Sequence, residues 1–412
     1  MNLWIFNQTT YSPDLPGGTR HYDLSRELVR RGHSVSIFAT SFHHHMHKEV
    51  RLQPGEDWRI EEIEGVRFVW IRTPPYQRND WRRVRNMVAF MFRSWRLGEK
   101  IPEIAPEIGT PDVIIGSSPH LLNPLAAWLV ARRFHVPFVM EVRDLWPQTI
   151  IDMGVMGPNH PIIKSLQALE RFLYHRAARI ITLLPMSHEY ITACGVPRDK
   201  IVWIPNGVDQ SRFSRASMKP ANHDGFQVMY LGAHGQANAL DVLLDAARII
   251  QDKGIQEIRF VLIGDGPEKP RLIRMAKELG LENVEFKNPV PKSRVPDVLR
   301  EADAFLFNLE DVAVFRYGIS PNKLFDFMAA GKPVISSVQA PENPVDAAQC
   351  GFTIQPRDSK SMAEAIMRLY NLPQETREKM GRRGRYYVEN HHDIARLAER
   401  LEDTLAQTLR TS

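Results

Sequence analysis

A lysine, an asparagine and an aspartate lie close together in a segment that could bind a phosphate group and a sugar hydroxyl. The segment is Ser320 to Pro333, in which Pro321 suits the first position of a helix and a glycine followed by a proline ends it. The first turn of a helix leaves backbone N–H groups unpaired, so Lys323 beside them favours phosphate binding. Asp326, one turn after Asn322, offers an acceptor for a sugar hydroxyl. The pattern predicts a nucleotide-sugar site, with an ordinary capped amphipathic helix as the alternative.

This segment resembles the donor-binding helix of retaining GT-B glycosyltransferases of family 4, also called group 1. Within that family the pattern resembles the subgroup of fucosamine-type and colanic-acid-type bacterial sugar transferases. The family carries two glutamates, with seven residues between them, ahead of a run of small residues. Asp326 stands at the second position, which the resemblance assigns to the ribose. Gly318 replaces the first glutamate, so the resemblance implies that backbone amides from Gly318 through Ile319 to Lys323 hold the donor sugar.

The composition is that of a globular protein with two domains. The chain has 412 residues, of which 25% are charged and 43% are hydrophobic, which is too long for one small core. The net charge of +5 fits an anionic substrate or an anionic membrane surface, and no nucleic-acid partner is predicted. Cys194 and Cys350 lie outside any metal spacing and favour a reducing cytosol. No secretory leader or membrane-spanning run is expected, so the predicted location is cytoplasmic.

The chain opens with the pattern of a Rossmann-like unit. A buried strand over 3–6 is followed by a turn-rich loop, a helix over 21–31 and a second strand over 35–39. The loop holds Gly17 and Gly18, which do not form a GxGxxG motif. They are either a flexible turn or, as the resemblance implies, a loop whose backbone closes on the donor diphosphate or the acceptor. Their place after the first strand favours the second interpretation.

Two charged residues follow a later apolar strand, over 137–142. In the resembling family a histidine near the donor sugar, often followed by an aspartate, occupies this strand end. Arg143 takes the place of the histidine and Asp144 that of the aspartate. A fixed cation suits phosphate binding better than acid–base work, whereas Asp144 could accept the proton of the acceptor hydroxyl. These two are the predicted catalytic residues, and a surface ion pair is the alternative.

The second half of the chain repeats the pattern of strand, small-residue loop and helix over 228–250. The wider family places an arginine and a lysine in this loop, both on the donor diphosphate. Ala233 and Asn238 occupy those places here, so both charges are missing. We therefore expect Arg143, Lys323 and backbone N–H groups to neutralise the diphosphate.

Other residues of the second half are weaker candidates for donor contacts. His234, which precedes Gly235, is either a bystander or a contact of the diphosphate. The segment 288–291, which contains Val290, resembles the one whose backbone contacts the nucleobase in the family. The Gly-Asp-Gly turn at 264–266 matches the family as well, although any doubly wound domain needs such turns.

No metal or cofactor is predicted. The sequence offers no Asp-x-Asp at a strand end, and in the resembling family helix termini and basic side chains stabilise the leaving diphosphate, so the nucleotide sugar is a substrate and no metal is required. His43, His44, His45 and His47 form a histidine cluster, but no carboxylate shares its spacing. We expect a solvated loop there and not a metal site.

The helix predicted over Trp81 to Arg96 carries apolar residues at helical spacing and five arginines without an acid. A basic amphipathic helix with tryptophans near both ends is typical of a protein that lies on an anionic leaflet. The alternative is a core helix with a solvated arginine face. A lipid-linked acceptor, which the resemblance implies, favours peripheral contact with the inner face of the cell membrane.

The predicted fold is α/β of the GT-B type, with two Rossmann-like doubly wound domains facing a central cleft. The first domain covers 1–207 and binds the acceptor, with 393–412 crossing back onto it. The second covers 208–392 and binds the nucleotide-sugar donor, after a linker over 211–224. Oligomeric state is left open.

The predicted function is a metal-independent hexosyltransferase of the retaining type. It would move an N-acetylated amino or 6-deoxyamino sugar from a nucleotide diphosphate, with UDP favoured, to a saccharide acceptor that is lipid-linked, in bacterial surface polysaccharide biosynthesis. A GT-B-fold UDP-sugar 2-epimerase is the alternative, although the basic Trp81 to Arg96 segment argues against it. A periplasmic-type binding protein would need an export signal.

Overall fold

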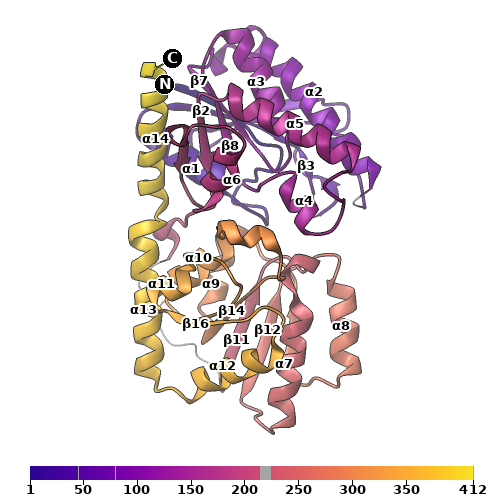
Figure 1. Ribbon diagram of the computed structural model, residues 1–412, viewed down its shortest axis with the longest axis vertical. Helices are drawn as coiled ribbons and strands as arrows, with labels where there is room; N and C mark the ends of the chain where they lie inside the picture. The colour runs from indigo at the N-terminus through magenta and orange to yellow at the C-terminus, as the bar shows by residue number, and fades with distance from the viewer. Residues whose placement is uncertain (45, 79, 214–223, 412) are drawn as a thin grey trace. The chain divides into compact units, whose positions relative to one another are not determined.

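The computed structural model describes residues 1–44, 46–78, 80–213 and 224–411 and divides the chain into two compact units (Figure 1). The first unit comprises Met1–Ser12, Thr19–Pro205 and Ile394–Ser412, and the second comprises Pro13–Gly18 and Asn206–Asp393. The glycine loop therefore groups with the second unit, whereas the sequence placed it in the first. Most of the linker expected over 211–224 lies outside the described residues.

The first unit is built on an eight-stranded sheet in the order β10-β9-β8-β7-β1-β2-β6-β5. All neighbours pair in parallel except β5 and β6, which form an antiparallel hairpin. The sequence analysis missed this hairpin, although Glu64 and Gly65, both with positive φ, form the two-residue turn that such hairpins favour. The strands are β1 (Asn2–Phe6), β2 (Ser34–Thr40), β5 (Trp58–Ile63), β6 (Val66–Ile71), β7 (Val113–Ser117), β8 (Phe138–Val142), β9 (Arg179–Thr182) and β10 (Ile201–Trp203).

Helices cover both faces of this sheet, and alternate residues of β1 meet different helices. Leu3 and Ile5 belong to a core that includes α1 and α14, whereas Trp4 packs edge to face on Phe134 of α3. The helix α2 also lies on the α3 side, because Gly98 of α2 packs against Val130 of α3. The helices are α1 (Arg20–Arg30), α2 (Trp81–Ile104), α3 (Leu122–Phe134), α4 (Gln148–Asp152), α5 (Pro161–Arg176), α6 (Ser187–Ala193) and α14 (Ile394–Thr411).

The second unit is built on a six-stranded parallel sheet in the order β13-β12-β11-β14-β15-β16. One buried core lies against α7, α8 and α12, and another lies against α9, α10, α11 and α13. The strands are β11 (Phe226–Leu231), β12 (Ile258–Ile263), β13 (Val284–Lys287), β14 (Ala304–Asn308), β15 (Val334–Ser337) and β16 (Gly351–Ile354). The helices are α7 (Leu240–Asp252), α8 (Lys269–Glu278), α9 (Val295–Leu299), α10 (Asn322–Ala329), α11 (Pro344–Ala348), α12 (Ser359–Asn371) and α13 (Gln374–His391).

The histidine cluster differs from the expected solvated loop. β3 (Phe42–His43) pairs with β4 (Lys48–Glu49), and the ring of His43 is buried and stacks on Tyr11 with the centroids 4.2 Å apart. The solvated-loop prediction is therefore wrong for His43, because this short ladder turns its side chain inward. His45 lies outside the described residues. Within the described part of the chain, no three His, Cys, Asp or Glu side chains gather as a metal site would require.

Two helices near the predicted sites have boundaries that the sequence did not give. Pro321 lies at the N-cap position, just before α10, and the helix itself begins at Asn322. The basic helix α2 continues beyond Arg96 to Ile104. None of the helices that the structure describes combines the length and the hydropathy needed to span a membrane.

Candidate active site

The predicted donor-side residues gather at one edge of the second unit's sheet. Strand β11 pairs with β12 on one side and β14 on the other, so the connections leave in opposite directions from this point. Ligands of open α/β sheets bind outside the carboxyl ends of the strands at such a switch. The loop after β11 holds His234 and Gly235, the loop after β13 holds Val290, and the loop after β14 leads through Gly318, Ile319 and Pro321 into α10, which begins with Asn322 and Lys323.

Lys323 projects from the first turn of α10 toward the loop after β11. Its ammonium group donates hydrogen bonds to the hydroxyl of Tyr230, at 3.0 Å, and to the side-chain oxygen of Asn238. It also lies 4.6 Å from the ring centroid of Tyr230 and 5.4 Å from that of Phe307. No carboxylate of the described residues pairs with it, and burial lowers the pKa of Lys323 to about 7. The site therefore holds a cation that lacks a counterion.

This geometry accounts for the missing charges of the β11 loop. The Lys323 ammonium group hydrogen-bonds Asn238, the residue that stands where the family has its lysine. A Cβ on Gly232 would lie 3.1 Å from Cδ of Lys323, so a glycine at this position leaves room for the lysine side chain. The positive charge thus reaches the loop from α10, which the sequence analysis listed as one of three sources.

His234, which belongs to this loop, is fully buried, and neither of its ring nitrogens is hydrogen-bonded. Burial, and then the nearby charge of Lys269, lower the pKa of His234 to about 4, so the ring is neutral at pH 7. A Cβ on Gly266 would meet the His234 backbone oxygen at 2.5 Å, and one on Gly264 would meet a ring carbon at 3.3 Å. The turn after β12 must therefore be glycine-rich to let the loop pack here.

Two residues that the sequence analysis missed hold this loop in place. Asn308, at the end of β14, donates to the backbone oxygens of Asn238 and Ala239 at 2.9 and 2.6 Å. Lys269 donates to the backbone oxygens of Gly264 and Lys287 at 2.8 and 2.9 Å. Asn308 satisfies carbonyls just ahead of α7, and Lys269, from the start of α8, satisfies carbonyls that follow β12 and end β13. For Asn308, a polar residue at the end of a buried strand was the available signal.

The segment before α10 has a backbone that only glycine takes without strain. Gly318 has φ of 92° and ψ of 179°, so the family's glutamate could not occupy this position as it stands. Pro321 offers no side-chain cap, and the first N–H groups of α10 remain available to a ligand. The replacement of glutamate by glycine therefore accompanies a backbone conformation of positive φ at this position.

Replacing Gly318 with alanine is expected to weaken donor binding without unfolding the second unit. The methyl group forces the backbone out of positive φ, which costs about 1–3 kcal/mol and moves the N–H groups ahead of α10. We expect the Kd for the donor, measured by calorimetry, to rise about ten-fold. Gly254→Ala is the matched control, because it also has positive φ, at 72°, but has open space around it and lies at the end of α7. Equal binding by both variants would exclude a role for this backbone.

A set of buried contacts, also missed from the sequence, fixes the start of α10. The side chain of Asn206 donates to the backbone oxygen of Ser320, and the Asn206 N–H donates to the Ser320 hydroxyl at 2.8 Å. The ring of His392 stacks on Phe325 at 3.8 Å, and its Nδ1 lies 2.9 Å from the backbone oxygen of Asn206. Asn206 is thereby tied to the segment that leads into α10.

Asp326, the predicted ribose acceptor, is buried and already has a partner. Its Oδ2 accepts a hydrogen bond from the ammonium group of Lys292, which the sequence analysis did not identify. This pair orients the carboxylate on the second turn of α10. A hydroxyl donor would have to use the remaining acceptor capacity of the carboxylate.

The glycine loop approaches the same helix. A Cβ on Gly18 would lie 3.2 Å from the side-chain nitrogen of Asn322, and Gly17 has φ of 140°. Ile319 is buried and Val290 packs beside the same apolar core, so their side chains support the loops, which leaves only their backbones for a ligand. The predicted donor-binding residues thus all lie in the second unit, whereas the predicted catalytic residues Arg143 and Asp144 belong to the first.

In the first unit, Arg143 and Asp144 follow β8 as expected, and Asp144 is exposed. Beneath them lies a buried polar cluster around Glu141, which the sequence treated as part of an apolar strand. Glu141 accepts from Nε of Arg20 at 2.9 Å, from Nε2 of His21 at 2.5 Å and from the hydroxyl of Ser117 at 2.5 Å. The Arg20 guanidinium also donates to the backbone oxygens of Ile204 and Pro205.

The charge state of this cluster follows from its hydrogen bonds. Burial alone would raise the pKa of Glu141, but His21, Arg20 and the hydroxyl of Ser117 hold it well below 4.5. Burial lowers the pKa of His21, and Asn7 donates to its Nδ1 at 2.8 Å, so a neutral ring protonated at Nε2 satisfies both neighbours. Glu141 and Arg20 are therefore a buried ion pair directly under the end of β8.

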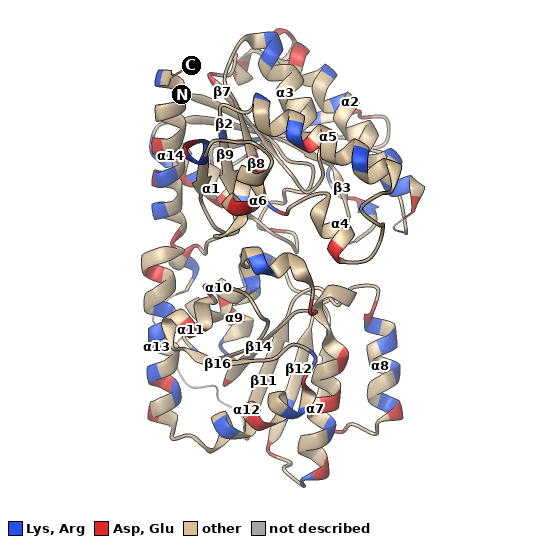
Figure 2. Cartoon of the chain, viewed as in Figure 1, with Lys and Arg blue, Asp and Glu red and all other residues tan. Residues whose placement is uncertain are grey.

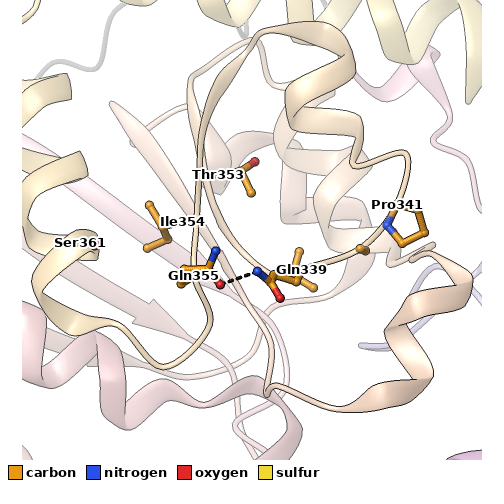
Figure 3. A pocket seen from close by; sticks show the side chains of 8 residues that line it. Gln339, Pro341, Thr353, Ile354, Gln355 and Ser361 are labelled. Atoms are coloured by element: carbon orange, nitrogen blue, oxygen red, sulfur yellow. Dashed lines mark hydrogen bonds between the residues drawn. The ribbon is translucent and has the colours of Figure 1, made fainter.

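A cavity of about 670 Å³ opens at the carboxyl ends of β15 and β16 (Figure 3). The side chains of Gln339 and Gln355 face each other there and are hydrogen-bonded. A cavity of about 500 Å³ adjoins Gly235 and the first turn of α7, with Arg357 paired to Asp241 and Glu310. Of these two cavities, only the second touches a predicted residue, and its two arginines, Arg271 and Arg357, are already paired with carboxylates.

Comparison with known proteins agrees with this architecture. Residues 17–207 match the model of the glycosyl transferase 4-like domain, and residues 225–372 match that of glycosyl transferases group 1. The chain is 24% identical over 350 residues to the putative colanic acid biosynthesis glycosyl transferase WcaI of Escherichia coli, which covers 80% of this chain and 82% of that protein.

Solved structures with the same fold cover nearly the whole chain. Sucrose-phosphate synthase from Thermosynechococcus elongatus superposes with a TM-score of 0.75 at 17% identity, covering 100% of this chain and 99% of that one. HepE from Anabaena, in complex with UDP and glucose, superposes with a TM-score of 0.69 at 14% identity, covering 98% and 99%. Two domain models in the expected order and this fold confirm the predicted family, and the chain belongs to the GT-B glycosyltransferases of group 1.

Proposed function

We propose that this protein is a hexosyltransferase that moves a sugar from UDP to a saccharide acceptor carried on a lipid, in the biosynthesis of a bacterial surface polysaccharide. The transferred group is an N-acetylated amino or 6-deoxyamino sugar, its anomeric configuration is retained, and no metal is required. The acceptor belongs to the first unit and the donor to the second. The protein works in the cytoplasm, with peripheral contact to the inner face of the cell membrane.

The observation that carries this proposal is the unpaired cation at the switch point of the second unit. Lys323 lies at the start of α10, where free N–H groups add positive potential, and beside the loop after β11. A diphosphate is the ligand that would use both features, and two negative charges would supply the missing counterion. Because the protein itself provides this positive charge, the leaving diphosphate has a stabiliser that is not a metal.

The proposed reaction breaks the bond between C1 of the sugar and the diphosphate oxygen and forms a bond from C1 to the acceptor oxygen. The proton of the acceptor hydroxyl passes to the leaving diphosphate, whose charge Lys323 and the α10 N–H groups stabilise. Attack and departure on the same face of the ring retain the configuration. Asp144 is exposed at the end of β8 and is the carboxylate that could accept the proton instead.

The comparisons support the finer parts of the proposal to different degrees. The HepE structure holds UDP, which favours UDP as the nucleotide here. The Escherichia coli relative carries a colanic acid biosynthesis name, which favours polysaccharide as the product. The proposal of an amino sugar depends on Gly318, which replaces a carboxylate with a backbone of positive φ, so that N–H groups would contact the sugar.

The test is a calorimetric titration of UDP, GDP, ADP and dTDP with and without a chelator. We expect UDP alone to bind, with the same Kd in the chelator, and Asp326→Asn to weaken it about ten-fold because the acceptor of the hydroxyl loses its charge. Asp297→Asn, in α9, is the matched control at an exposed carboxylate. Failure of all four nucleotides would overturn the donor assignment, and binding that needs a metal would overturn metal independence.

Product analysis separates transfer from epimerisation and retention from inversion. With an acceptor present, NMR of the new glycosidic bond should show the anomeric configuration of the donor. An inverted product would reject the retaining mechanism. Conversion of the UDP-sugar to its 2-epimer without any acceptor would favour the epimerase alternative instead.

A further inference from the structure

The helix α2 keeps an apolar stripe in solvent. Three residues spaced along one side of α2 are among the exposed large hydrophobic side chains: Trp81 is 63% exposed, Val84 56% and Phe92 50%. At about 100° per residue, these residues and the partly buried Val88 and Trp95 fall within about 80° of one another. The residues that give α2 its apolar periodicity in the sequence therefore lie largely on a face that does not pack in the core.

A different face of α2 makes the core contacts. Its buried residues centre about 130° away from the apolar stripe. They include small and polar residues that allow close packing and hydrogen bonding: Asn86, Phe90, Ser94, Gly98 and Ile101. For example, the side chain of Asn86 donates to the hydroxyl of Thr73 at 2.7 Å. The core-helix alternative thus holds for this face and leaves the aromatic stripe unexplained.

A third face of α2 is basic and borders the stripe. It lies about 100° from the apolar stripe on the wheel, with no acid in α2 before Glu99. The guanidinium groups of Arg82 and Arg85 lie 5.7 and 5.6 Å from the ring of Trp81, and that of Arg96 lies 5.0 Å from Trp95. Figure 2 shows Lys and Arg recurring along α2. Acidic neighbours are few: Asp57 lies 3.7 Å from Arg93, and Asp80 caps the helix.

The connection from α4 to α5 exposes a second apolar set, which the sequence analysis did not identify. Val155 is 66% exposed, Ile162 51% and Met153 44%. Gly154 ends α4 with φ of 70°, and the N–H groups of Gly154 and Val155 donate to the carbonyls of Ile151 and Ile150. This is the Schellman arrangement, whose residue after the glycine usually packs back on its helix. Here Val155 points into solvent instead.

The two apolar sets follow β6 and β8, which run in the same direction in the first unit's sheet. The first turn of α2 comes after β6 and that of α5 comes after β8, so both lie toward the carboxyl edge of the first unit's sheet. From Met153 to Leu169 the chain has no acid, and it carries Lys164 on α5. Apolar side chains with basic neighbours therefore recur in two elements that begin at the same edge.

We propose that α2 and the segment 153–162 together form a surface that inserts into an anionic lipid leaflet, with the apolar side chains in the acyl boundary and the arginines on the headgroups. The basic face favours an anionic bilayer over a protein partner, because it surrounds its tryptophans with positive charge. The proposal deepens the proposed function by naming what holds the protein near a lipid-linked acceptor. It rests on that function for its purpose only.

The experiment is co-sedimentation of the full chain with vesicles of phosphatidylcholine and phosphatidylglycerol, compared with phosphatidylcholine alone. We expect binding to the anionic vesicles only. Arg85→Glu with Arg96→Glu should reduce partitioning at least ten-fold, since each basic residue contributes about five-fold. Phe92→Ser should reduce it about ten-fold, and Val155→Ser with Ile162→Ser should do the same although both lie outside α2.

Matched control variants make the same changes of charge and of exposed apolar side chains at positions outside the proposed surface. Arg274→Glu with Lys277→Glu, on α8, changes the net charge equally, and Tyr386→Ser on α13 and Leu409→Ser on α14 remove exposed apolar side chains outside the proposed surface. All should bind vesicles as the unmodified chain does. Tryptophan fluorescence of every variant shows whether the first unit, which holds all eight tryptophans, is intact, and UDP titration shows whether the second unit is. Loss of vesicle binding with both signals kept is therefore specific.

Three outcomes would overturn this surface. One is no sedimentation with anionic vesicles. Another is unchanged partitioning of the 153–162 variant, which would remove the second segment from the surface. The third is a dimer in gel filtration that Phe92→Ser dissociates, because the stripe would then pack on a second copy. Failure of the unmodified chain to bind UDP would instead contradict the donor assignment.

Discussion

Lys323→Met is expected to weaken binding of a UDP-sugar by about 100-fold or more. The methionine keeps the apolar stem against Tyr230 and Phe307 but removes the charge that pairs with the diphosphate. Truncating one partner of a desolvated, hydrogen-bonded charge pair costs about 2–5 kcal/mol, and every 1.4 kcal/mol is about ten-fold in Kd. Calorimetry at pH 7 measures the loss. Lys277→Met, on exposed α8, is the control and should bind as the unmodified chain does.

The same lysine gives donor binding a pH dependence of a definite sign. In the free protein the pKa of Lys323 is about 7, because burial disfavours the ammonium form. Below pH 7 the group is already charged, and the Kd should not change with pH. Above pH 7 binding must first protonate it, so the Kd rises about ten-fold per pH unit and one proton is taken up. The two phosphates of a UDP-sugar do not titrate in this range.

Titration at pH 8 in two buffers of different ionisation enthalpy counts that proton directly. Lys323→Arg carries a fixed charge and should show neither proton uptake nor a pH-dependent Kd. His234 does not interfere, because burial lowers its pKa to about 4. A pH-independent Kd for the unmodified chain between pH 7 and 9 would contradict the role of Lys323.

Glu141→Ala is expected to destabilise the first unit by about 3–5 kcal/mol at pH 7. The change leaves the Arg20 guanidinium buried without its counterion and removes the acceptor of His21 and Ser117. Breaking a buried ion pair by removing one partner has a cost of about this size. All eight tryptophans of the chain lie in the first unit, so tryptophan fluorescence in urea reports its unfolding without the second unit.

The pH dependence of this effect also has a definite sign. The pKa of Glu141 is held well below 4.5 in the folded protein, so its stabilisation is complete above 4.5 and is lost as the pH falls through the folded value. Glu103→Ala, at an exposed position of α2, is the control and should leave the unfolding midpoint unchanged. A Glu141 variant as stable as this control would show that the cluster is not energetically coupled.

The sequence by itself determined the fold class and most of the donor-side residues. Strands buried on both faces give continuous apolar runs, and small-residue loops must follow them, so the two Rossmann-like repeats could be recognised without coordinates. The segment Ser320 to Pro333 combined a helix start with Lys323 and Asp326, and the structure places both on α10. Such signals are local, because backbone geometry and side-chain spacing depend on neighbouring residues.

Only the tertiary structure decided which charges meet. Glu141 lies 120 residues or more along the chain from His21 and Arg20. Their pairing depends on β8 lying next to β7 in the sheet. The reach of Lys323 to Asn238, the pairing of Asp326 with Lys292 and the hold of Asn206 on Ser320 likewise join distant segments. The helical periodicity of α2 shows an apolar stripe but not which face is buried. Burial is a property of the whole packed unit, so sequence spacing alone could not assign it.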